Sequence, residues 1–254
     1  ANTWNTPVKI QVELGGMMLD PASFARIPQG AGPGLTYQPY DSVNGLPPGE
    51  VAILFLTGEA SSSVPCPVTP ARPSSVAVAS TGIGQAFRVT TDVPVVMYQM
   101  NPYGGGNAAV TGASLLLPTS AWDTNYVAVN VSPLDIGYGP SMNIIASEDN
   151  TTVTMLPNAA VVGGGGIPAG AANAALVFNL NRGQHAQITQ NAELTGSAVQ
   201  SDKPIGFLAG QPCMRYPTGV AYCDHGEQMI PPVRALGSKY VGVMHRQRLT
   251  EPAF

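Results

Sequence analysis

Turn residues divide this sequence into short apolar or alternating runs, and this division restricts the fold more than any other feature. Glycine accounts for 29 and proline for 24 of the 254 residues, spread over the whole length. Such frequent breakers exclude long helices, because glycine weakens a helix and proline interrupts it. The runs between them have the length and period of strands that are buried on one or both faces. The sequence therefore predicts an all-β fold of antiparallel β-sandwich modules.

Two runs and one turn illustrate the pattern. Residues 8–14 (VKIQVEL) alternate cleanly, whereas residues 50–56 (EVAILFL) are apolar on both faces, as in a central strand. Asp149 and Asn150 come directly before residues 151–156 and are typical of a hairpin turn. Further strands are expected at 76–79, 86–90, 93–100, 126–131, 142–146, 151–156, 174–179, 184–190, 197–200, 205–209 and 240–244. Helix is restricted to single turns near residues 21–24, 120–124 and 233–237.

Charged residues are sparse in this chain. It has 11 Lys and Arg against 15 Asp and Glu, and the formal net charge is −4. The basic surface that nucleic acids require is therefore missing. An apolar content of 44% excludes disorder, and no apolar run reaches the roughly 18 residues that suggest a membrane-spanning helix.

Two blocks of the sequence recur in the same order. Residues 91–102 (TDVPVVMYQMNP) resemble 201–212 (SDKPIGFLAGQP), and residues 117–129 (LPTSAWDTNYVAV) resemble 231–243 (PPVRALGSKYVGV). The matched pairs are Asp92 and Asp202, Pro94 and Pro204, Pro102 and Pro212, Pro118 and Pro232, Ala121 and Ala235, Tyr126 and Tyr240, and Val129 and Val243. The offset is 110 residues in the first block and 114 in the second, which fits a four-residue insertion between them. This order and spacing predict an internal repeat.

The repeated residues suggest a structure for each block. We expect Asp92 and Asp202 to accept backbone N–H groups in a tight turn, and Pro94 and Pro204 each to begin a strand. The second block should carry Trp122 or Leu236 into a core, before a strand that begins at the tyrosine. A functional alternative is that Asp92 and Asp202 are calcium ligands.

The repeat divides the chain into three regions, which we expect to be an N-terminal β region (1–80), a first repeat module (81–192) and a second module (193–254). The second module is incomplete, because the counterpart of residues 148–156 would fall at 262–270. We therefore expect either a longer polypeptide or another chain to supply the missing strands, since an unpaired apolar edge invites pairing.

The three cysteines leave an odd thiol in any pairing. Cys213 and Cys223 lie ten residues apart in a segment with turn residues, a spacing that suits a loop closed by a disulfide. The alternative is two free, buried thiols, and the sequence gives no partner for Cys66. The chain begins at Ala1 without the features of a signal peptide, so one has been removed or there was none. The low charge and the expected disulfide favour export.

Several segments resemble the IgGFc-binding protein N-terminal domain family. The similarity covers about residues 45–250 and is carried by 86–106, 113–129, 193–210 and 213–241. Its most specific part is Cys213, the Cys223-Asp224-His225 triplet, and Gln228 followed by Pro231 and Pro232. Members occur in secreted bacterial surface proteins and at the start of a large animal mucus protein. The resemblance implies an exported, β-rich interaction or adhesion module without known catalysis, whose domain usually continues further toward the C-terminus.

The sequence offers little for catalysis. It contains no Gly-x-Ser-x-Gly and no His-Glu-x-x-His motif, and its three histidines are too few for most catalytic zinc sites. Asp224, His225 and Glu227 form the densest reactive group, for which we expect a structural role, with metal binding as the alternative. We expect no cofactor, calcium being the one candidate.

Three functions remain to be compared. We favour an extracellular or cell-surface structural or adhesive module that binds other proteins or itself. The alternatives are a glycan- or small-ligand-binding lectin-like domain, using Tyr37, Tyr40 and Tyr103, and a secreted hydrolase. A pocket with converging carboxylates and aromatics would favour the alternatives, whereas edge strands completed by another chain would favour the module.

Overall fold

The computed structural model describes residues 1–58, 66–101, 112–130, 139–215, 219, 221 and 223–243. Strands dominate these residues, and every pairing between two named strands is antiparallel. The helices of this part are the single turn α1 (Pro21–Phe24) and the 3-10 turns η1 (Gly32–Gly34), η2 (Thr119–Ala121) and η3 (Val233–Ala235). The predictions of an all-β antiparallel fold and of the single turns at α1, η2 and η3 are confirmed, whereas η1 was not predicted.

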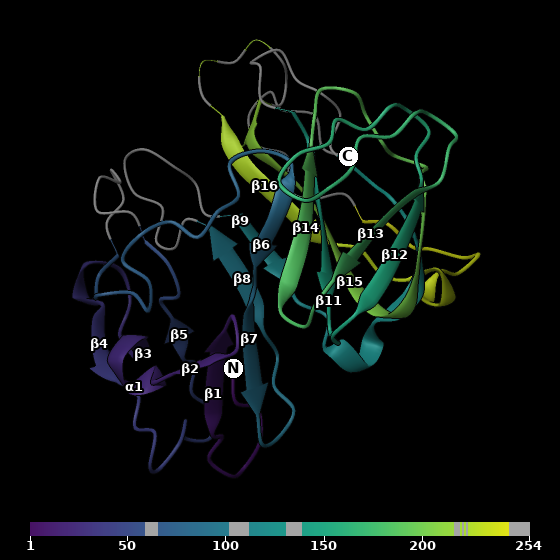
Figure 1. The fold of residues 1–254 in the computed structure, drawn as a ribbon. Helices are drawn as coiled ribbons and strands as arrows, with labels where there is room; N and C mark the ends of the chain where they lie inside the picture. The colour runs from purple at the N-terminus through teal and green to yellow at the C-terminus, as the bar shows by residue number, and fades with distance from the viewer. Residues whose placement is uncertain are drawn as a thin grey trace.

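The N-terminal region forms two small sheets, at the lower left of Figure 1. In one, β1 (Ile10–Leu14) lies between β2 (Met17–Leu19) and β7 (Phe87–Thr91). In the other, β3 (Ala25–Gln29) lies between β4 (Thr36–Pro39) and β5 (Ile53–Leu54). Their small core consists of Val8, Ala25, Ile27, Tyr40 and Leu46. A separate hairpin joins β8 (Tyr98–Asn101) to β9 (Gly112–Leu115).

The larger sheet has eight strands around the central strand β15 (Ala198–Met214). The others are β6 (Gly82–Gln85), β10 (Asp123–Val127), β11 (Ser141–Ala146), β12 (Thr151–Leu156), β13 (Leu176–Leu180), β14 (Gln184–Thr189) and β16 (Asp224–Met229). β12 pairs with the first part of β15 and β11 with its second part. β10 pairs with both parts, opposite Val199 and Ile205. Because β10 occupies one edge of β15, β11 and β12 lie one after the other along the opposite edge.

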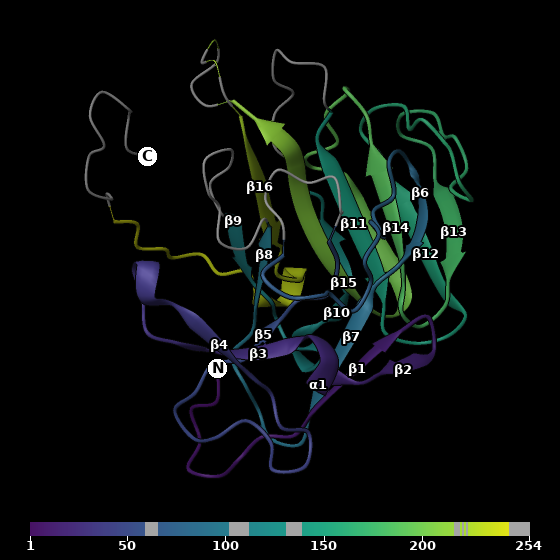
Figure 2. The ribbon, with the colours of Figure 1, turned by 90° about the vertical axis from the view of Figure 1, so that its left-hand side faces the viewer.

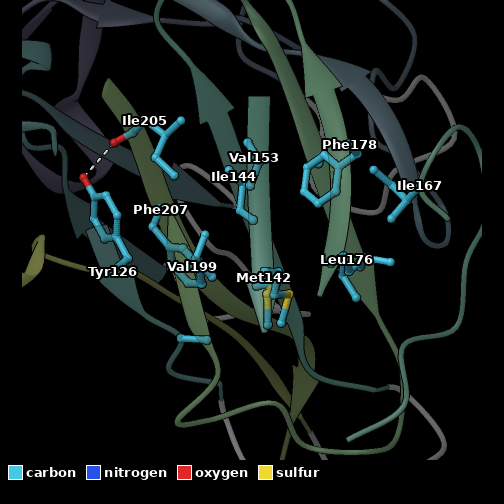
Figure 3. Packing of buried hydrophobic residues seen from close by; sticks show 14 of the residues in the cluster. Tyr126, Met142, Ile144, Val153, Ile167, Leu176, Phe178, Val199, Ile205 and Phe207 are labelled. Atoms are coloured by element: carbon cyan, nitrogen blue, oxygen red, sulfur yellow. Dashed lines mark hydrogen bonds between the residues drawn. The ribbon is translucent and has the colours of Figure 1, made fainter. Parts of the chain in front are cut away.

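This arrangement makes the large sheet turn a corner and curl around one core. The corner runs through three short segments at which the chain passes from one pairing to the next. Residues 147–150 lie between β11 and β12, residues 181–183 lie between β13 and β14, and residues 202–204 lie within β15. Figure 3 shows the apolar side chains of these strands facing one another. The buried cluster includes Tyr126, Met142, Ile144, Val153, Met155, Leu176, Phe178, Val199, Ile205 and Phe207.

Some expected strands differ in the structure. The hairpin predicted at Asp149 and Asn150 is wrong: Asn150 has the left-handed φ of 53° that such a turn needs, but β11 and β12 pair with β15 instead of each other. Residues 76–79 form no strand, and the Val78 carbonyl accepts the side-chain amide of Gln187 at 2.6 Å. The strand expected at 50–56 is reduced to β5.

The small and large sheets meet where β6 leads into β7. β6 pairs with β14 of the large sheet, and β7 pairs with β1 of the small one. Arg182 also forms an ion pair with Glu13 of β1 at 2.9 Å. Strands from residues 81–192 and from residues 193–254 share the large sheet. The division into three regions therefore stays a prediction.

Candidate functional site

The two repeat aspartates make the same hydrogen bond to equivalent strands. Asp92 Oδ1 accepts the backbone N–H of Lys9 at 2.8 Å, directly before β1. Asp202 Oδ1 accepts that of Thr152 at 2.7 Å, at the start of β12. The aspartates thus accept backbone N–H groups, but from a neighbouring strand instead of their own turn. Each carboxylate fixes where an adjacent strand begins.

The hydroxyl residue before each aspartate repeats a second contact. Thr91 Oγ1 donates to the Val93 carbonyl at 2.8 Å, and Ser201 Oγ donates to the Lys203 carbonyl at 2.6 Å. Both bonds close the same tight bend in the backbone. The Ser/Thr-Asp-x-Pro sequence is therefore a corner motif that turns a strand from one partner to the next.

The proline of each motif lies within this corner. Pro204 lies inside β15, where the strand leaves β12 for β11, and Pro94 lies between β7 and β8. The prediction that each proline begins a strand is wrong. A proline has no N–H to donate, so it is tolerated where a strand changes partner. The Pro94 carbonyl accepts the Trp4 indole N–H, and the Pro204 carbonyl accepts the Ser147 hydroxyl.

The strand pairings after the two corners have the same register. Tyr98 lies opposite Leu115 in the β8–β9 hairpin, and Leu208 lies opposite Met229 between β15 and β16. These partners are related by the two offsets found in the sequence. Pro102, which belongs to the first repeat block, lies outside the described residues.

The equivalence also extends to strands before the corners, which the sequence comparison missed. Ile10 of β1 lies opposite Thr91, and Val153 of β12 lies opposite Ser201. β1 is therefore the counterpart of β12. The two strands share an alternation of apolar and polar residues but few identical residues. The alternating runs at 8–14 and 151–156 were therefore the only sequence feature that could have indicated their equivalence.

A 3-10 turn follows each hairpin. The Ala121 N–H donates to the Pro118 carbonyl at 2.8 Å in η2, and the Ala235 N–H donates to the Pro232 carbonyl at 2.9 Å in η3. η3 is held beside β10 because Arg234 Nε lies 2.9 Å from Asp123 Oδ2. The chain therefore leaves both turns with the same local structure.

Tyr126 anchors β10, the strand that follows η2, to the core. Its hydroxyl donates to the Ile205 carbonyl at 2.6 Å, as Figure 3 shows, and accepts the Asp123 N–H at 3.3 Å. Its ring stacks on Phe207 with a centroid distance of 5.9 Å. Burial raises the pKa of the Tyr126 hydroxyl. The hydroxyl therefore remains a proton donor at neutral pH.

The segment after η3 has the same local bond, but none of the strands that the structure describes lies beside it. The Tyr240 hydroxyl accepts the Gly237 N–H at 2.7 Å, at the position equivalent to Asp123. Tyr240 is nevertheless 75% exposed, Val241 97% and Val243 79%, against 2% for Tyr126. Residues 236–243, which we call the C-terminal segment, extend away from the green strands in Figure 2. The strand expected at 240–244 is absent from residues 240–243, and residue 244 lies outside the described part.

Leu236 does not pack on a neighbouring strand as the partly buried Trp122 does. Trp122 packs over Gly206, where an added Cβ would lie 2.7 Å from the indole ring. Leu236 is exposed, and the prediction that it is a core residue is wrong. Its local turn is that of Trp122, but no described strand lies where β15 lies in the first copy.

The reactive cluster is tied into the β15–β16 hairpin. Cys213 and Cys223 form a disulfide with a Cα–Cα distance of 5.0 Å. Glu227 Oε2 lies 3.2 Å from His225 Nε2 and accepts the Gln99 amide at 2.6 Å, which links β16 to β8. Nothing is described for the Asp224 side chain. In the part of the chain that the structure describes, no three His, Cys, Asp or Glu residues are placed to hold a metal.

Two of the tyrosines proposed for ligand binding make contacts within the fold. Tyr40 is 2% exposed and accepts the Ile10 N–H at 2.9 Å through its hydroxyl. Tyr37 meets Phe55 edge to face at a centroid distance of 5.9 Å. Tyr103 lies outside the described residues. The buried ring of Tyr40 is unavailable for stacking on a glycan.

The remaining cysteine, Cys66, is free of any disulfide, and burial raises the pKa of its thiol. No helix in the described ranges has the length and apolar character needed to cross a membrane.

Comparison with known proteins gives one match. No curated protein and no solved structure matches the chain. A family model described as IgGFc binding protein matches residues 112–253, more than half of the 254 residues. This range contains η2 and η3, the corner at Asp202, the disulfide and the C-terminal segment. The resemblance seen in the sequence is confirmed, and the chain belongs to the IgGFc binding protein family, a family of extracellular protein-binding domains.

Proposed function

We propose that this chain is a structural or adhesive module of an extracellular assembly. It binds other proteins, or further copies of itself, through the C-terminal segment, catalyses no reaction and needs no cofactor. The observation that supports the proposal is a contrast between two segments that each follow a 3-10 turn and repeat the same tyrosine bond. Residues 123–127 form a strand of the large sheet, whereas residues 237–241 form no strand and lie exposed.

The chemistry of the C-terminal segment suits a protein partner. An extended segment offers backbone N–H and C=O groups along its length, and these can join the edge of another sheet. Tyr240, Val241 and Val243 add apolar surface that water solvates poorly. A β-strand from a protein would satisfy both the backbone and the side chains.

Structural contacts of the reactive residues support a role without catalysis. The two cysteines close a hairpin, and Glu227 links His225 to Gln99 of another strand. Asp92 and Asp202 each hold a backbone N–H. These residues therefore have roles in the fold that need neither substrate nor metal.

Site-specific photo-crosslinking tests the proposed function. Val241→benzoylphenylalanine is introduced into the protein in cells that make it, and the extracellular material is irradiated. Val162→benzoylphenylalanine is the matched control, because Val162 is also exposed, at 62%, but lies outside the segment. We expect protein adducts at position 241 and not at 162. Equal labelling at both positions, or no protein adduct at 241, would contradict the proposal.

A further inference from the structure

We infer that the partner of the C-terminal segment is the free edge of β7 in a second copy of this chain. This inference rests on the proposed function and names its partner. The molecule already contains a template for this contact, the pairing of β10 with β15.

That interface has two halves, a strand and the edge that receives it. The strand half is β10, which follows η2 and packs Tyr126 on the sheet. The C-terminal segment repeats this half, because it follows η3 and carries Tyr240 at the position of Tyr126. The receiving half is the part of β15 that precedes the Asp202 corner.

β7 repeats the receiving half. It precedes the Asp92 corner and pairs with β1 on one edge, as β15 pairs with β12. Its other edge corresponds to the edge of β15 that holds β10, and no described strand pairs with it. Val89, the counterpart of Val199, is only partly buried, whereas Val199 is 2% exposed under β10. β7 therefore has the position of a receiving strand whose cover is missing.

The known interface fixes the register of the new one. In the template, Asp123 lies opposite Ile205, Asn125 opposite Gln200, Tyr126 opposite Val199 and Val127 opposite Ala198. The offsets of 114 for the strand and 110 for the edge place Gly237 opposite Val95, Lys239 opposite Thr90, Tyr240 opposite Val89 and Val241 opposite Arg88. The Tyr240 hydroxyl would then donate to the Val95 carbonyl, as Tyr126 donates to Ile205.

The strand half and the receiving edge are different segments of the chain, so a contact between two copies is head to tail. Such heterologous contacts lead to open chains unless the geometry closes a ring. One short strand gives a weak single contact, and repeated contacts along an assembly strengthen it through avidity. This would suit a module of an extracellular assembly.

Cysteine trapping tests the register directly. One protein carries Val241→Cys and another carries Arg88→Cys, both in a Cys66→Ser background that retains the native disulfide. After mixing under mild oxidation, we expect a disulfide-linked dimer of the two proteins. Val241→Cys mixed with Val43→Cys is the control, because Val43 is 77% exposed but lies outside β7. This mixture should give at most about a tenth as much dimer, the ratio for a contact weaker by 1.4 kcal/mol.

Sedimentation velocity of the unmodified chain complements the trapping. We expect concentration-dependent association that Tyr240→Asp weakens about tenfold, because its counterpart Tyr126 is buried and the aspartate would bring a charge into that position, and that Val43→Asp leaves unchanged. Dimer formation that is equal at positions 88 and 43, or association that Tyr240→Asp does not weaken, would overturn the inference. A disulfide within one chain carrying both Arg88→Cys and Val241→Cys, with no dimer, would also overturn it. Photo-crosslinks from position 241 to an unrelated protein would retain the proposed function and reject β7 as partner.

Discussion

Residues 123–127 and 237–241 make the same local hydrogen bonds but differ in how far they are exposed to solvent. Each leaves a 3-10 turn that begins after a proline, and each folds a tyrosine hydroxyl back onto a main-chain N–H. The first lies beside β15 and its tyrosine is buried, whereas the second has no described strand beside it and its tyrosine is exposed. Local sequence thus determines the path of the chain, but burial requires a neighbouring strand.

The residues that follow the two corners show the same contrast. Phe207 of β15 is fully buried under Tyr126, whereas Met97, its counterpart after the Asp92 corner, is partly exposed. Both residues accept an equivalent hydrogen bond through their carbonyls: the Ile230 N–H donates to Phe207 and the Leu116 N–H to Met97, each at 2.9 Å. The backbone of the two copies is alike, and the side chains differ in how completely they are covered.

Truncating these two side chains should give the largest difference between the copies. Phe207→Ala removes a fully buried ring and should lower the free energy of unfolding by about 3–5 kcal/mol. Met97→Ala should cost less than half as much, because part of its surface already meets water. Urea unfolding of both variants measures the two values. Equal losses would mean that Met97 is covered in solution, as it would be in an assembled form.

Removing the tyrosine hydroxyls sharpens the comparison at one atom. Tyr126→Phe leaves the buried Ile205 carbonyl without this donor, at a cost of about 1–3 kcal/mol. Tyr240→Phe removes an acceptor from an exposed N–H that water can satisfy, so stability should change little. Chemical unfolding at low protein concentration separates the two variants. A loss for Tyr240→Phe that approaches that of Tyr126→Phe would show that the C-terminal segment is covered even in the monomer.

The matching local contacts could be predicted from the sequence, but only in part, and the internal repeat itself stays a prediction. Identical residues at the corners, such as Asp92 and Asp202, indicated equivalent bonds because the same turn demands the same side chains. The equivalence of β1 and β12 escaped notice because a strand needs only alternation, which many residues satisfy. Contacts that depend on local backbone geometry were therefore predictable, and strand partners were not.

The candidate site shows the same limit. The sequence placed Tyr126 and Tyr240 as equivalents and Leu236 as a core residue like Trp122. The equivalence is present in the local bonds, but Leu236 is exposed because its neighbour is absent from the described chain. In the same way, Asp149 and Asn150 predicted a turn correctly and its strand pairing incorrectly. Whether a side chain is buried depends on the tertiary partner, which local sequence does not specify.

The corner aspartates provide a test in which the two copies should agree. Asp202→Ala and Asp92→Ala each remove the acceptor of one strand-initiating N–H, with losses of about 1 kcal/mol. The Asn variants should retain most of this stability, because an amide oxygen also accepts. Thermal unfolding of the four variants gives the values. A loss at Asp202 alone would separate the two corners and weaken the case for a structural repeat.

Acidification should produce the smallest effect, confined to the eight-stranded sheet. Burial lowers the pKa of His185 in β14 below its usual 6.5, so the folded protein binds this proton less readily than the unfolded chain. The contribution of neutral His185 to stability is thus present above the unfolded pKa and is lost as the pH falls below about 6.5. The residues of the small sheet that contains β1 and β7 include no histidine. Hydrogen exchange between pH 7 and about 5.5, before most carboxylates titrate, should therefore show β14 opening more easily while β1 changes little beyond the intrinsic rate.

His185→Gln should remove the difference, because a glutamine can donate to Asn143 Oδ1 as the ring nitrogen does at 2.9 Å but does not titrate. If β1 loosens in parallel with β14, the two sheets unfold as one unit. The exposed edge of β7 would then share the stability of the core against which β10 packs.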